Sequence, residues 1–282
     1  MEPPRMEQMK LIFVLALLFV AASASWVNDL SASEKRNLLG AQIAYVDLPK
    51  RSGASNSPMP TEFDSRTKWP GLVTPVRNQA RCGSCWAFSA TGALSDRFAI
   101  HSNGAQKPIL SPQDPVSCDT SDYGCNGGYL DNVWNYFVQS GVVLDSCYPY
   151  VSGNGYVPSC ASNCPSGQTW KKYYAKDPVD VSANEQAIME EIYNNGPVQA
   201  AFSVYQDFFD YVPGTVYQHK YGGLDGGHAV VIVGWKVVEG KKAWIVRNSW
   251  DTTWGISGYW YHLKGVNECG IESMVVAGLP KL

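Results

Sequence analysis

The stretch from Gln79 to Ser89 contains a thiol and, six positions before it, a side-chain amide, which are two groups that acyl transfer needs. Ser84 has the residue type of a helix N-cap, and residues 86–101 contain neither proline nor a run of β-branched side chains, so we expect a helix to begin near Cys85. The N-terminus of a helix carries partial positive charge and free N–H groups, which favour a thiolate. The pattern predicts a cysteine nucleophile.

A cysteine nucleophile needs a base, and the base needs a third group to orient its ring. Among the four histidines, His228 follows two glycines and precedes an apolar, strand-like run, which predicts an imidazole at the flexible edge of a strand. Asn248 lies twenty residues further on and offers an amide to orient that imidazole, while Trp250 could shield the hydrogen bond from water. We expect His101 and His262 to have structural positions. His219 is expected to line the cleft without doing chemistry.

Four ordered blocks of the sequence resemble the papain-like cysteine peptidases, namely Gln79 to Ser89, Cys125 to Gly128, Gly227 to Ala229, and Asn248 to Trp250 with Trp254 and Gly255. This family has a Cys-His-Asn arrangement, and the 143 positions between Cys85 and His228 fall within its usual spacing. Further stretches are similar to the cathepsin B branch: Ser95 to Arg97, Gly196 to Val198, Ala201 to Tyr205 and Cys269 to Ser273. The resemblance covers nearly all of residues 59–282.

The resemblance implies a role for each of these residues. Cys85 would be the nucleophile, His228 its ion-pair partner and the proton donor to the leaving amine, and Asn248 the residue that orients the imidazole. Gln79 and the Cys85 backbone N–H would form the oxyanion hole. The resting state is then expected to be a thiolate–imidazolium pair. The residues implied to bind an extended substrate are a backbone edge and five side chains: Gly127, Gly128, Leu130, Ala201, Ala229, Trp250 and Met274.

Eight cysteines leave seven beside the nucleophile, so at least one stays unpaired. The resemblance implies three disulfides, Cys82–Cys125, Cys118–Cys160 and Cys147–Cys164, with Cys269 free, whereas spacing alone cannot choose a connectivity. Cys82 and Cys85 also form a C-x-x-C, so a secreted thiol oxidoreductase stays an alternative. Without a second C-x-x-C to complete a zinc site, we expect neither a metal nor another cofactor.

Two departures from cathepsin B affect the predicted specificity. The resemblance implies a long occluding loop with histidines that dock a C-terminal carboxylate, but residues 148–159 are short and contain no cysteine, histidine or basic residue. This predicts an endopeptidase with little carboxydipeptidase activity. Met274 stands where cathepsin B has a glutamate, which predicts an apolar residue two positions before the scissile bond. Glu272 could still accommodate a basic residue there.

The chain is expected to divide into a signal peptide (1–24), a short propeptide (25–58) and a mature α+β domain (59–282) with the papain-like two-lobe fold. A basic flank, a short apolar run and an Ala-x-Ala site predict the signal, although a short buried hydrophobic segment is the alternative. The propeptide could also be a flexible arm without inhibitory role. Within the mature domain, residues 59–168 should form a helical, disulfide-rich lobe with a helix at Leu130–Gln139. Residues 169–282 should form a β-barrel-like lobe with strands that include Val198–Tyr205 and Tyr259–Leu263, and a cleft should lie between the lobes.

Capping boxes predict two further helices, one from Ser31–Glu34 ahead of Leu38, Leu39 and Ile43, and one from Ser182–Glu185. Residues 50–58 are polar and turn-rich, which predicts an exposed cleavage linker.

The composition limits the partners that we expect. A net charge of −3 suggests no basic face, so nucleic acid is an unlikely partner, and no membrane association is expected after signal removal. Expected partners are peptide and protein substrates, the propeptide as inhibitor and cystatin-like inhibitors, with the protein a monomer. The signal predicts the secretory pathway, ending in a lysosome-like vesicle or outside the cell. A catalytically silent homologue that acts as a binding protein is the remaining alternative.

Overall fold

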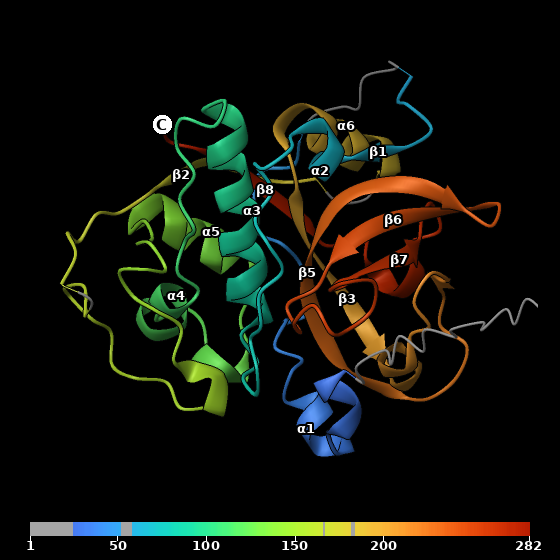
Figure 1. Cartoon of the computed structure of the whole chain (residues 1–282), viewed down its shortest axis with the longest axis horizontal. Helices are drawn as coiled ribbons and strands as arrows, with labels where there is room; N and C mark the ends of the chain where they lie inside the picture. The colour runs from blue at the N-terminus through green and yellow to red at the C-terminus, as the bar shows by residue number, and fades with distance from the viewer. Residues whose placement is uncertain (1–24, 52–57, 166, 182–183) are drawn as a thin grey trace, which may run out of the picture.

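The computed structural model describes residues 25–51, 58–165, 167–181 and 184–282. The predicted signal peptide and most of the predicted cleavage linker lie outside the described residues. One half of the molecule is mainly helical and most strands lie in the other half, with helix α3 (Cys85–His101) at the boundary (Figure 1). This is the predicted two-lobe α+β architecture.

Helix α3 runs through the interior, and every side chain from Cys85 to Ile100 is buried. The helix begins where its small and apolar residues predict, but Ser84 at the N-cap position makes no capping hydrogen bond. Its hydroxyl instead lies 2.9 Å from the phenol oxygen of Tyr150. Ser84 thus occupies the predicted N-cap position, but a tertiary contact holds its hydroxyl away from the helix.

The rest of the helical lobe consists of α4 (Gln113–Cys118), α5 (Leu130–Gln139), two short 3₁₀ turns (Gly124–Asn126 and Ser152–Asn154) and long loops. Helix α5 has the predicted bounds and buries one face, formed by Leu130, Val133, Trp134 and Phe137. This spacing is that of an amphipathic helix. The three disulfides of the described chain all lie in this lobe, where they connect segments that have little regular structure.

The β lobe is built on one sheet with the strand order β2-β8-β3-β5-β6-β7-β4, and β1 pairs with β5 beside this path. The path is open in the described chain rather than closed into a barrel. Neighbouring strands are antiparallel except for the pair β4 and β7. The strands are β1 (Phe63–Asp64), β2 (Ala175–Asp180), β3 (Val198–Tyr205), β4 (Val216–Tyr217), β5 (Leu224–Val238), β6 (Lys241–Arg247), β7 (Tyr259–Leu263) and β8 (Val275–Pro280).

The lobes exchange segments, so the boundary predicted near residue 168 is too simple. Strand β1 and the following α2 (Ser65–Lys68) come from the first half of the chain but pack on β5, where Phe63 stacks on Trp235 at 5.0 Å. In the other direction, β2 and β8 extend to α5 in the helical lobe. Apolar residues at both ends of the mature domain thus find their partners across the boundary.

Helix α6 (Glu185–Asn195) covers the sheet near this boundary. Asn184, within the predicted Ser182–Glu185 capping box, is the N-cap and accepts from first-turn N–H groups, and Ser182 lies outside the described residues. The helix ends at Gly196, whose φ of +99° is a conformation that glycine adopts readily. The buried Arg97 of α3 donates to the carbonyls of Gly196 and Pro197 and pairs with Glu191 at 2.8 Å, which ties the two lobes together.

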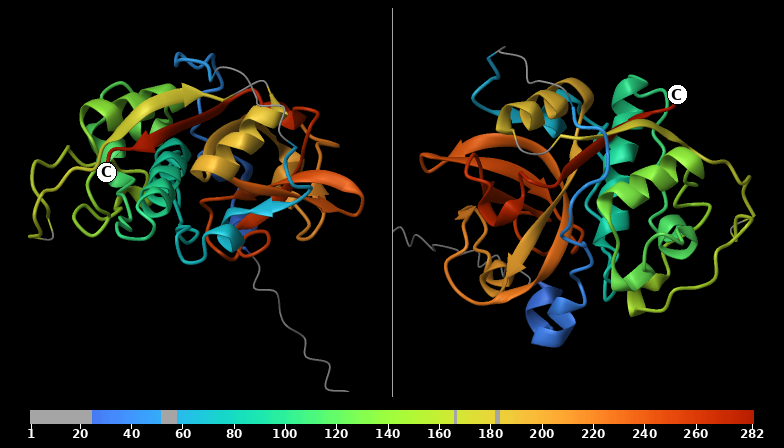
Figure 2. Two further views of the ribbon diagram at one scale, coloured as in Figure 1. Left: turned by 90° about the horizontal axis from the view of Figure 1, so that it is seen from above. Right: turned by 180° about the vertical axis from the view of Figure 1, so that it is seen from behind.

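Residues 25–51, which we call the N-terminal segment, cross the boundary between the lobes (Figure 2). The segment contains a 3₁₀ turn (Trp26–Asp29) and helix α1 (Ala32–Arg36), which has the predicted capping box of Ser31 and Glu34. The helix ends before the apolar residues that we expected it to include, and the chain then runs without regular secondary structure. Its buried side chains join the cores of both lobes: Val27, Leu30, Leu38, Ala41, Val46 and Leu48.

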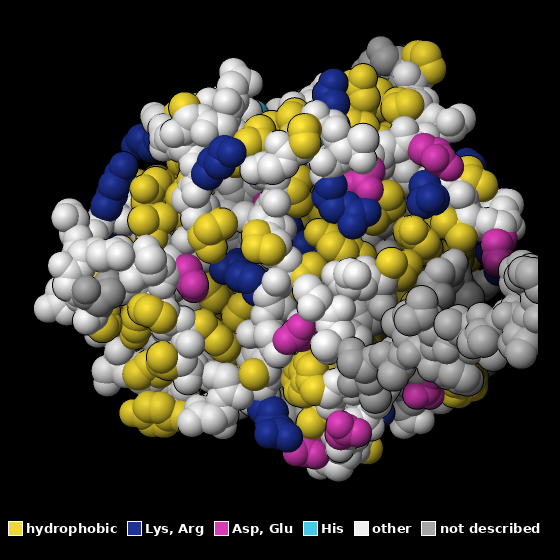
Figure 3. All heavy atoms as spheres, in the orientation of Figure 1, with side chains coloured by type: hydrophobic (Ala, Val, Ile, Leu, Met, Phe, Trp, Pro, Cys, Tyr) yellow, Lys and Arg dark blue, Asp and Glu magenta, His cyan; other side chains and the backbone are white. Residues whose placement is uncertain are grey.

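The surface shows no single-sign patch on the face of Figure 3, where Lys and Arg side chains are interspersed with Asp and Glu. Within the described ranges, no helix combines the length and the apolar character that crossing a membrane requires.

Candidate active site

Cys85 is the first residue of α3 and is fully buried. The backbone N–H of Gly40, in the N-terminal segment, donates to its sulfur at 3.3 Å. Backbone N–H groups of Trp86 and Ala229 also contact this sulfur, the first from the helix terminus and the second from β5. Burial nevertheless raises the pKa of the Cys85 thiol to about 11.

His228 lies within β5, opposite Phe202 of β3, and is fully buried. Its Nε2 is 2.8 Å from Oδ1 of Asn248, so the ring N–H donates to the amide oxygen. Trp250 stacks on the imidazole with a centroid distance of 4.6 Å and covers this hydrogen bond. Since Nε2 carries the proton, Nδ1 of the neutral ring is free to accept one, and it has no hydrogen-bond partner among the described residues.

Burial opposes the charged forms of both Cys85 and His228 while the N-terminal segment covers the site. It lowers the pKa of His228 to about 4 and raises that of Cys85, because both charged forms lose their hydration. The thiolate–imidazolium pair stays a prediction for the site without this segment. Removing residues 37–42 would return water and reduce this penalty.

Gln79 is buried beside the thiol, in the segment that leads to α3. Its side-chain N–H₂ group donates to the carbonyls of Leu38 and Cys82, each at 2.8 Å. Its side-chain oxygen accepts from the Ser249 hydroxyl at 2.6 Å, which fixes the orientation of the amide. One donor of Gln79 thus points at a backbone carbonyl in the cleft.

Gly128 provides the backbone edge that the sequence predicts. Its N–H donates to the Gly40 carbonyl at 2.8 Å, and its carbonyl accepts from the Gln42 N–H at 3.0 Å. A Cβ atom at Gly128 would lie 2.6 Å from the Trp86 ring, so only glycine fits. Gly127 precedes it with a φ of +113°, and a Cβ there would lie 2.7 Å from the Gly40 carbonyl oxygen.

Four of the predicted substrate-binding side chains share one apolar cluster: Leu130, Ala201, Ala229 and Met274. Val46 and Leu48 of the N-terminal segment belong to the same cluster. Trp250 is separate from it, because it packs under His228 in the core of the β lobe. The cluster is therefore a place where an apolar side chain from a bound segment can be buried.

Glu272 does not face this apolar cluster. Its carboxylate accepts from the Trp244 indole at 2.8 Å and from the backbone N–H groups of Gly265 and Asn267. The carboxylate is only 7% exposed, and these three donors hold it in the turn before β8. The suggested role of Glu272 toward a basic substrate residue does not fit this geometry.

The loop of residues 148–159 lies against the segment that carries Gln79. The Tyr150 hydroxyl donates to the Gln79 carbonyl at 2.8 Å, and the Gly153 carbonyl accepts from the Arg81 N–H at 2.9 Å. Gln113 accepts from the N–H groups of Val151 and Ser152, which fixes the turn. The short loop thus packs beside the site.

Comparison with known proteins identifies the family. The family model described as papain family cysteine protease matches residues 59–279. The chain belongs to the papain family of cysteine proteases. Within the family it is similar to cathepsin B-like cysteine proteinase 4 of Caenorhabditis elegans, with 41% identity over 79% of this chain and 76% of that protein. A gut-specific cysteine proteinase of the same organism is 45% identical over 79% of this chain and 74% of its own length.

Solved structures agree with this placement in the papain family. Procathepsin B S9 from Trypanosoma congolense superposes with a TM-score of 0.84 at 34% identity, covering 90% of each chain. A digestive procathepsin L2 from the Tenebrio molitor larval midgut gives a TM-score of 0.78 at 26% identity, over 91% of this chain and 82% of that one. The protein is thus a cysteine peptidase of the cathepsin B-like type.

The cysteine pairing separates the peptidase from the thiol oxidoreductase alternative. The structure contains the disulfides Cys82–Cys125, Cys118–Cys160 and Cys147–Cys164, which are the pairs that the family resemblance implies. Cys85 and Cys269 are free thiols. Because Cys82 is bonded to Cys125, the C-x-x-C pair is not available as a redox dithiol.

The remaining histidines do not join the papain-family site. His262 is buried and bonded to the Glu268 carbonyl, and His101 contacts the Asn195 carbonyl. His219 lies 3.1 Å from Asp207 and stacks on Tyr205, so the structure gives it local partners.

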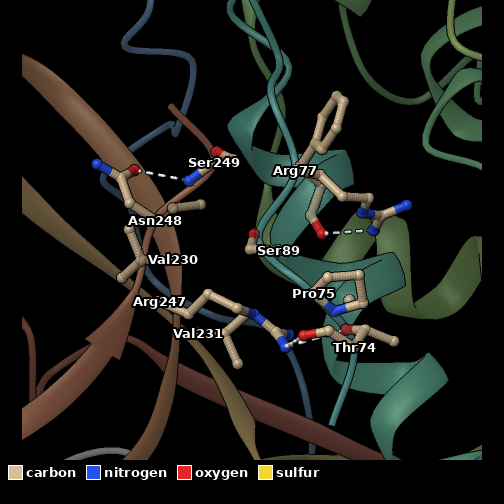
Figure 4. Close-up of a pocket in the computed structure, with 12 residues that line it drawn as sticks. Thr74, Pro75, Arg77, Ser89, Val230, Val231, Arg247, Asn248 and Ser249 are labelled. Carbon is tan, nitrogen blue, oxygen red and sulfur yellow. Dashed lines mark hydrogen bonds between the residues drawn. The ribbon is translucent and has the colours of Figure 1, made fainter. Parts of the chain in front are cut away.

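A small cavity of about 20 Å³ lies directly behind the site, between α3, the middle of β5 and the end of β6 (Figure 4). Ser89 faces it from the helix, while Val230, Val231, Asn248 and Ser249 border it from the strands. A space of this size holds at most one water molecule. The two walls of the site are therefore closely packed.

Sequence reasoning missed several residues that hold the site together. The Gln199 amide of β3 donates to the Trp86 carbonyl and to the Ser89 hydroxyl, which fastens the first turn of α3 to the sheet. Gly40 approaches so closely that a Cβ would lie 1.7 Å from the Gly83 carbonyl oxygen. Neither residue belongs to a motif, so only the fold reveals them.

Proposed function

We propose that this chain is the zymogen of a cysteine endopeptidase in which Cys85, His228 and Asn248 carry the chemistry and Gln79 stabilises the oxyanion. One observation supports this proposal most directly. Gln79, the Cys85 thiol and Gly128 all hydrogen-bond to the backbone of one extended segment in the cleft. A peptide substrate would present the same backbone groups to these residues.

The proposed reaction uses these groups in turn. His228 Nδ1 takes the thiol proton, and the Cys85 sulfur attacks the scissile carbonyl carbon. The negative charge on the carbonyl oxygen is stabilised by the Gln79 amide and the Cys85 backbone N–H, as the Leu38 carbonyl is in contact with Gln79 here. His228 then protonates the leaving amine as the C–N bond breaks. Water attacks the resulting thioester, with His228 accepting its proton, and the carboxylic acid leaves.

The N-terminal segment would act as the inhibitor of this site until it is removed. It contacts the Gln79 amide through Leu38, the thiol through Gly40 and the substrate edge through Gln42. Its pairing at Ala41 and Gly128 is parallel. The relatives described as procathepsins support a propeptide, and a cleavage between this segment and Met59 would open the cleft.

The short loop of residues 148–159 supports endopeptidase activity. It carries no cationic side chain that would dock a C-terminal carboxylate, and its contacts with Gln79, Arg81 and Gln113 hold it beside the site. We expect internal cleavage of long peptides and little stepwise removal of C-terminal dipeptides. Efficient dipeptide release that is abolished by amidating the substrate would contradict this expectation.

The apolar cluster around Met274 supports a preference for Leu, Val or an aromatic residue two positions before the scissile bond. Val46 and Leu48 already bury their side chains in this cluster, and Glu272 is held elsewhere by three donors. The matched test compares fluorogenic peptides that differ only at this position. Faster cleavage of Arg-Arg than of Phe-Arg or Val-Arg peptides would contradict the preference.

The predicted signal and the three disulfides support passage through an oxidising secretory compartment, with a vesicular or extracellular destination. Two relatives are described as gut-specific and digestive, which supports proteins in general as the substrate class. We also infer a monomer that cystatin-like inhibitors would bind at the open cleft.

The test of the proposed function is labelling of the matured protein with an epoxysuccinyl inhibitor while the hydrolysis of a Phe-Arg peptide is followed. We expect one adduct, on Cys85, with a matching loss of hydrolysis and no adduct on Cys269. An intact, labelled Cys85 in a protein without hydrolytic activity would favour the silent binding protein instead.

A further inference from the structure

Tyr150 contacts two residues of the segment that precedes the nucleophile. Its hydroxyl donates to the Gln79 carbonyl at 2.8 Å and lies 2.9 Å from the Ser84 hydroxyl. A phenol has a single proton, which the Gln79 carbonyl uses because a carbonyl can only accept. Ser84 must therefore donate to the Tyr150 oxygen. The hydroxyl proton of Ser84 and the position of its oxygen are thus set by Tyr150.

This contact has a consequence for the first turn of α3. A serine at the N-cap position normally accepts a hydrogen bond from the second or third N–H of the helix. Ser84 makes no such bond, and its backbone has φ −101° and ψ 17° instead of the extended conformation typical of a cap. The second N–H of the helix, that of Trp86, contacts the Cys85 sulfur instead.

The Tyr150 hydroxyl also holds the backbone of Gln79 from the side of the helical lobe. The Gln79 N–H donates to the Ser249 carbonyl at 2.9 Å in the β lobe, while its carbonyl accepts from Tyr150 in the helical lobe. The ring of Tyr150 packs edge-on against Phe88 at 4.7 Å, so the phenol is held in place by the helix itself. Burial raises the pKa of Tyr150 to about 12, which keeps the hydroxyl protonated at any pH at which the enzyme would work.

We propose that Tyr150 is a positioning residue that withholds the Ser84 hydroxyl from the N-terminus of α3 and anchors Gln79, so that the Trp86 and Cys85 N–H groups stay available to the reacting sulfur and oxygen. The proposal rests on the proposed peptidase function. In the absence of the Tyr150 hydroxyl, Ser84 can rotate and cap the helix. The cap would then compete with the thiolate for the same N–H group, and Gln79 would lose one of its two backbone anchors.

The test uses the matured product of the wild type and of the variants Tyr150→Phe, Ser84→Ala and the double variant. Tyr150→Phe keeps the ring against Phe88 and removes only the hydroxyl. We expect kcat for a Phe-Arg peptide to fall about 10-fold with KM within about twofold, because the loss acts on positioning and not on substrate contacts. We also expect the pH at which Cys85 becomes reactive toward iodoacetamide to rise.

The double variant separates positioning from simple damage. If the freed Ser84 hydroxyl competes for the helix N–H groups, Ser84→Ala should restore part of the activity that Tyr150→Phe loses. Two independent defects would multiply instead, and that result would overturn the competition argument. Tyr211→Phe is the matched control, since Tyr211 also donates to one backbone carbonyl and accepts from one backbone N–H, far from the thiol in sequence.

Other outcomes are equally decisive. A Tyr150→Phe enzyme with the kcat and the iodoacetamide profile of Tyr211→Phe would overturn the proposal. If Tyr150→Phe does not fold, Ser84→Ala alone decides: a kcat near that of the wild type supports a hydroxyl that is only withheld from the helix, and a fall in kcat of about 10-fold or more would overturn the proposal. If the wild-type product itself does not hydrolyse peptides, the proposed function fails, while the iodoacetamide profiles still report on the position of the hydroxyl.

Discussion

The helical lobe and the β lobe each bring one half of the site to the cleft, and they hold it by different interactions. On the helical side, the Cys82–Cys125 disulfide joins the segment before Cys85 to the segment that carries Gly127 and Gly128. The other two disulfides fix the loops behind it. In the part of the chain that the structure describes, the β lobe has no disulfide. There His228 is held by strand pairing with β3 and by a stack of aromatic side chains.

The aromatic stack of the β lobe continues well below the imidazole. Trp250 lies between His228 and Phe209, at 4.6 and 5.4 Å. Its other neighbours are Phe208 and Trp254, both of which contact Trp260. Such clusters bury large apolar areas and order the ring that they cover. In the helical lobe, loops closed by disulfides permit close approach to the backbone of a bound segment. In the β lobe, the register of the sheet sets the position of the His228 imidazole. Four experiments test this division between the two lobes, from the largest expected effect to the smallest.

The strongest test removes one reacting group from each lobe. We expect Cys85→Ala and His228→Ala each to lower kcat/KM by about 10⁵-fold or more, because nucleophile and base act as a unit. For the same reason, the double variant should be no slower than either single variant. The measurement is hydrolysis of a Phe-Arg peptide by the matured proteins.

Cys269→Ser is the control for thiol removal, because this second free cysteine lies near Glu268 and Tyr217. Full activity is expected for that variant. Substantial activity in His228→Ala would mean that the β lobe contributes less to the chemistry than its geometry suggests.

A smaller effect is expected from the groups that support the reacting pair. Gln79→Ala removes the donor that contacts the Leu38 carbonyl, and Asn248→Ala removes the acceptor that orients His228. We expect about a 100-fold loss of kcat in Gln79→Ala and about 10- to 100-fold in Asn248→Ala, with KM little changed. The two losses differ in their pH dependence.

Gln79→Ala should leave the pH–rate profile in place, since the oxyanion donor does not titrate. Asn248→Ala should move it, because the imidazole loses its fixed tautomer. Identical profiles for the two variants would show that the lobes are not separable in this way.

The N-terminal segment contacts both lobes, and Gly40→Ala tests its fit to the helical side. An added Cβ would lie 1.7 Å from the Gly83 carbonyl oxygen, so residues 38–42 must shift away from the thiol. We expect the full-length zymogen to be labelled at Cys85 by an epoxysuccinyl reagent about 10-fold faster or more, as a few kcal/mol of contacts are lost. Gln42→Ala is the matched control within the segment, because its backbone pairing with Gly128 persists. An unchanged labelling rate in Gly40→Ala would show that the segment does not limit access to the thiol.

The smallest effect concerns Asp122, which lies behind the Gly128 edge in the helical lobe. A Cβ at Gly128 would lie 2.8 Å from the Asp122 carboxyl carbon, and Asp122 Oδ1 accepts from the Tyr129 N–H. Oδ2 of Asp122 and Oδ2 of Asp119 are both buried without a hydrogen-bond donor among the described residues. Burial raises the pKa of Asp122 to about 7, and that of Asp119 is also raised.

The sign of the pH effect follows from the proton count. Between pH of about 4, where the unfolded aspartate titrates, and about 7, the folded chain holds a proton at Asp122 that the unfolded chain has lost. The free energy of unfolding should therefore decrease as the pH rises through this window. Asp122→Asn supplies a permanent donor, so we expect its melting temperature to change less with pH and to exceed that of the wild type by a few degrees at pH 7.

Asp210→Asn, at an exposed carboxylate, is the control and should follow the wild-type curve. A parallel pH dependence in wild type and Asp122→Asn would show that this carboxyl does not retain its proton.

The sequence determined the local features of this protein. Helix α5 and strands β3 and β7 have the predicted bounds, because their spacing of apolar residues satisfies one helical or strand period. The motif residues Cys85, His228, Asn248 and Gln79 were identified from residue type, order and family resemblance. The disulfide pairing came from that resemblance alone, since spacing leaves many pairings open.

Only the tertiary structure decided which distant groups meet and which state they adopt. The hydroxyl of Ser84 caps no helix because Tyr150, 66 positions away, binds it. Glu272 turns from the apolar cluster because Trp244 and two backbone N–H groups surround it, and burial opposes the charged forms of Cys85 and His228. Local sequence encodes the spacing of apolar residues and the preference for turns. The hydrogen-bond partners of a side chain and its hydration depend on how the whole chain packs.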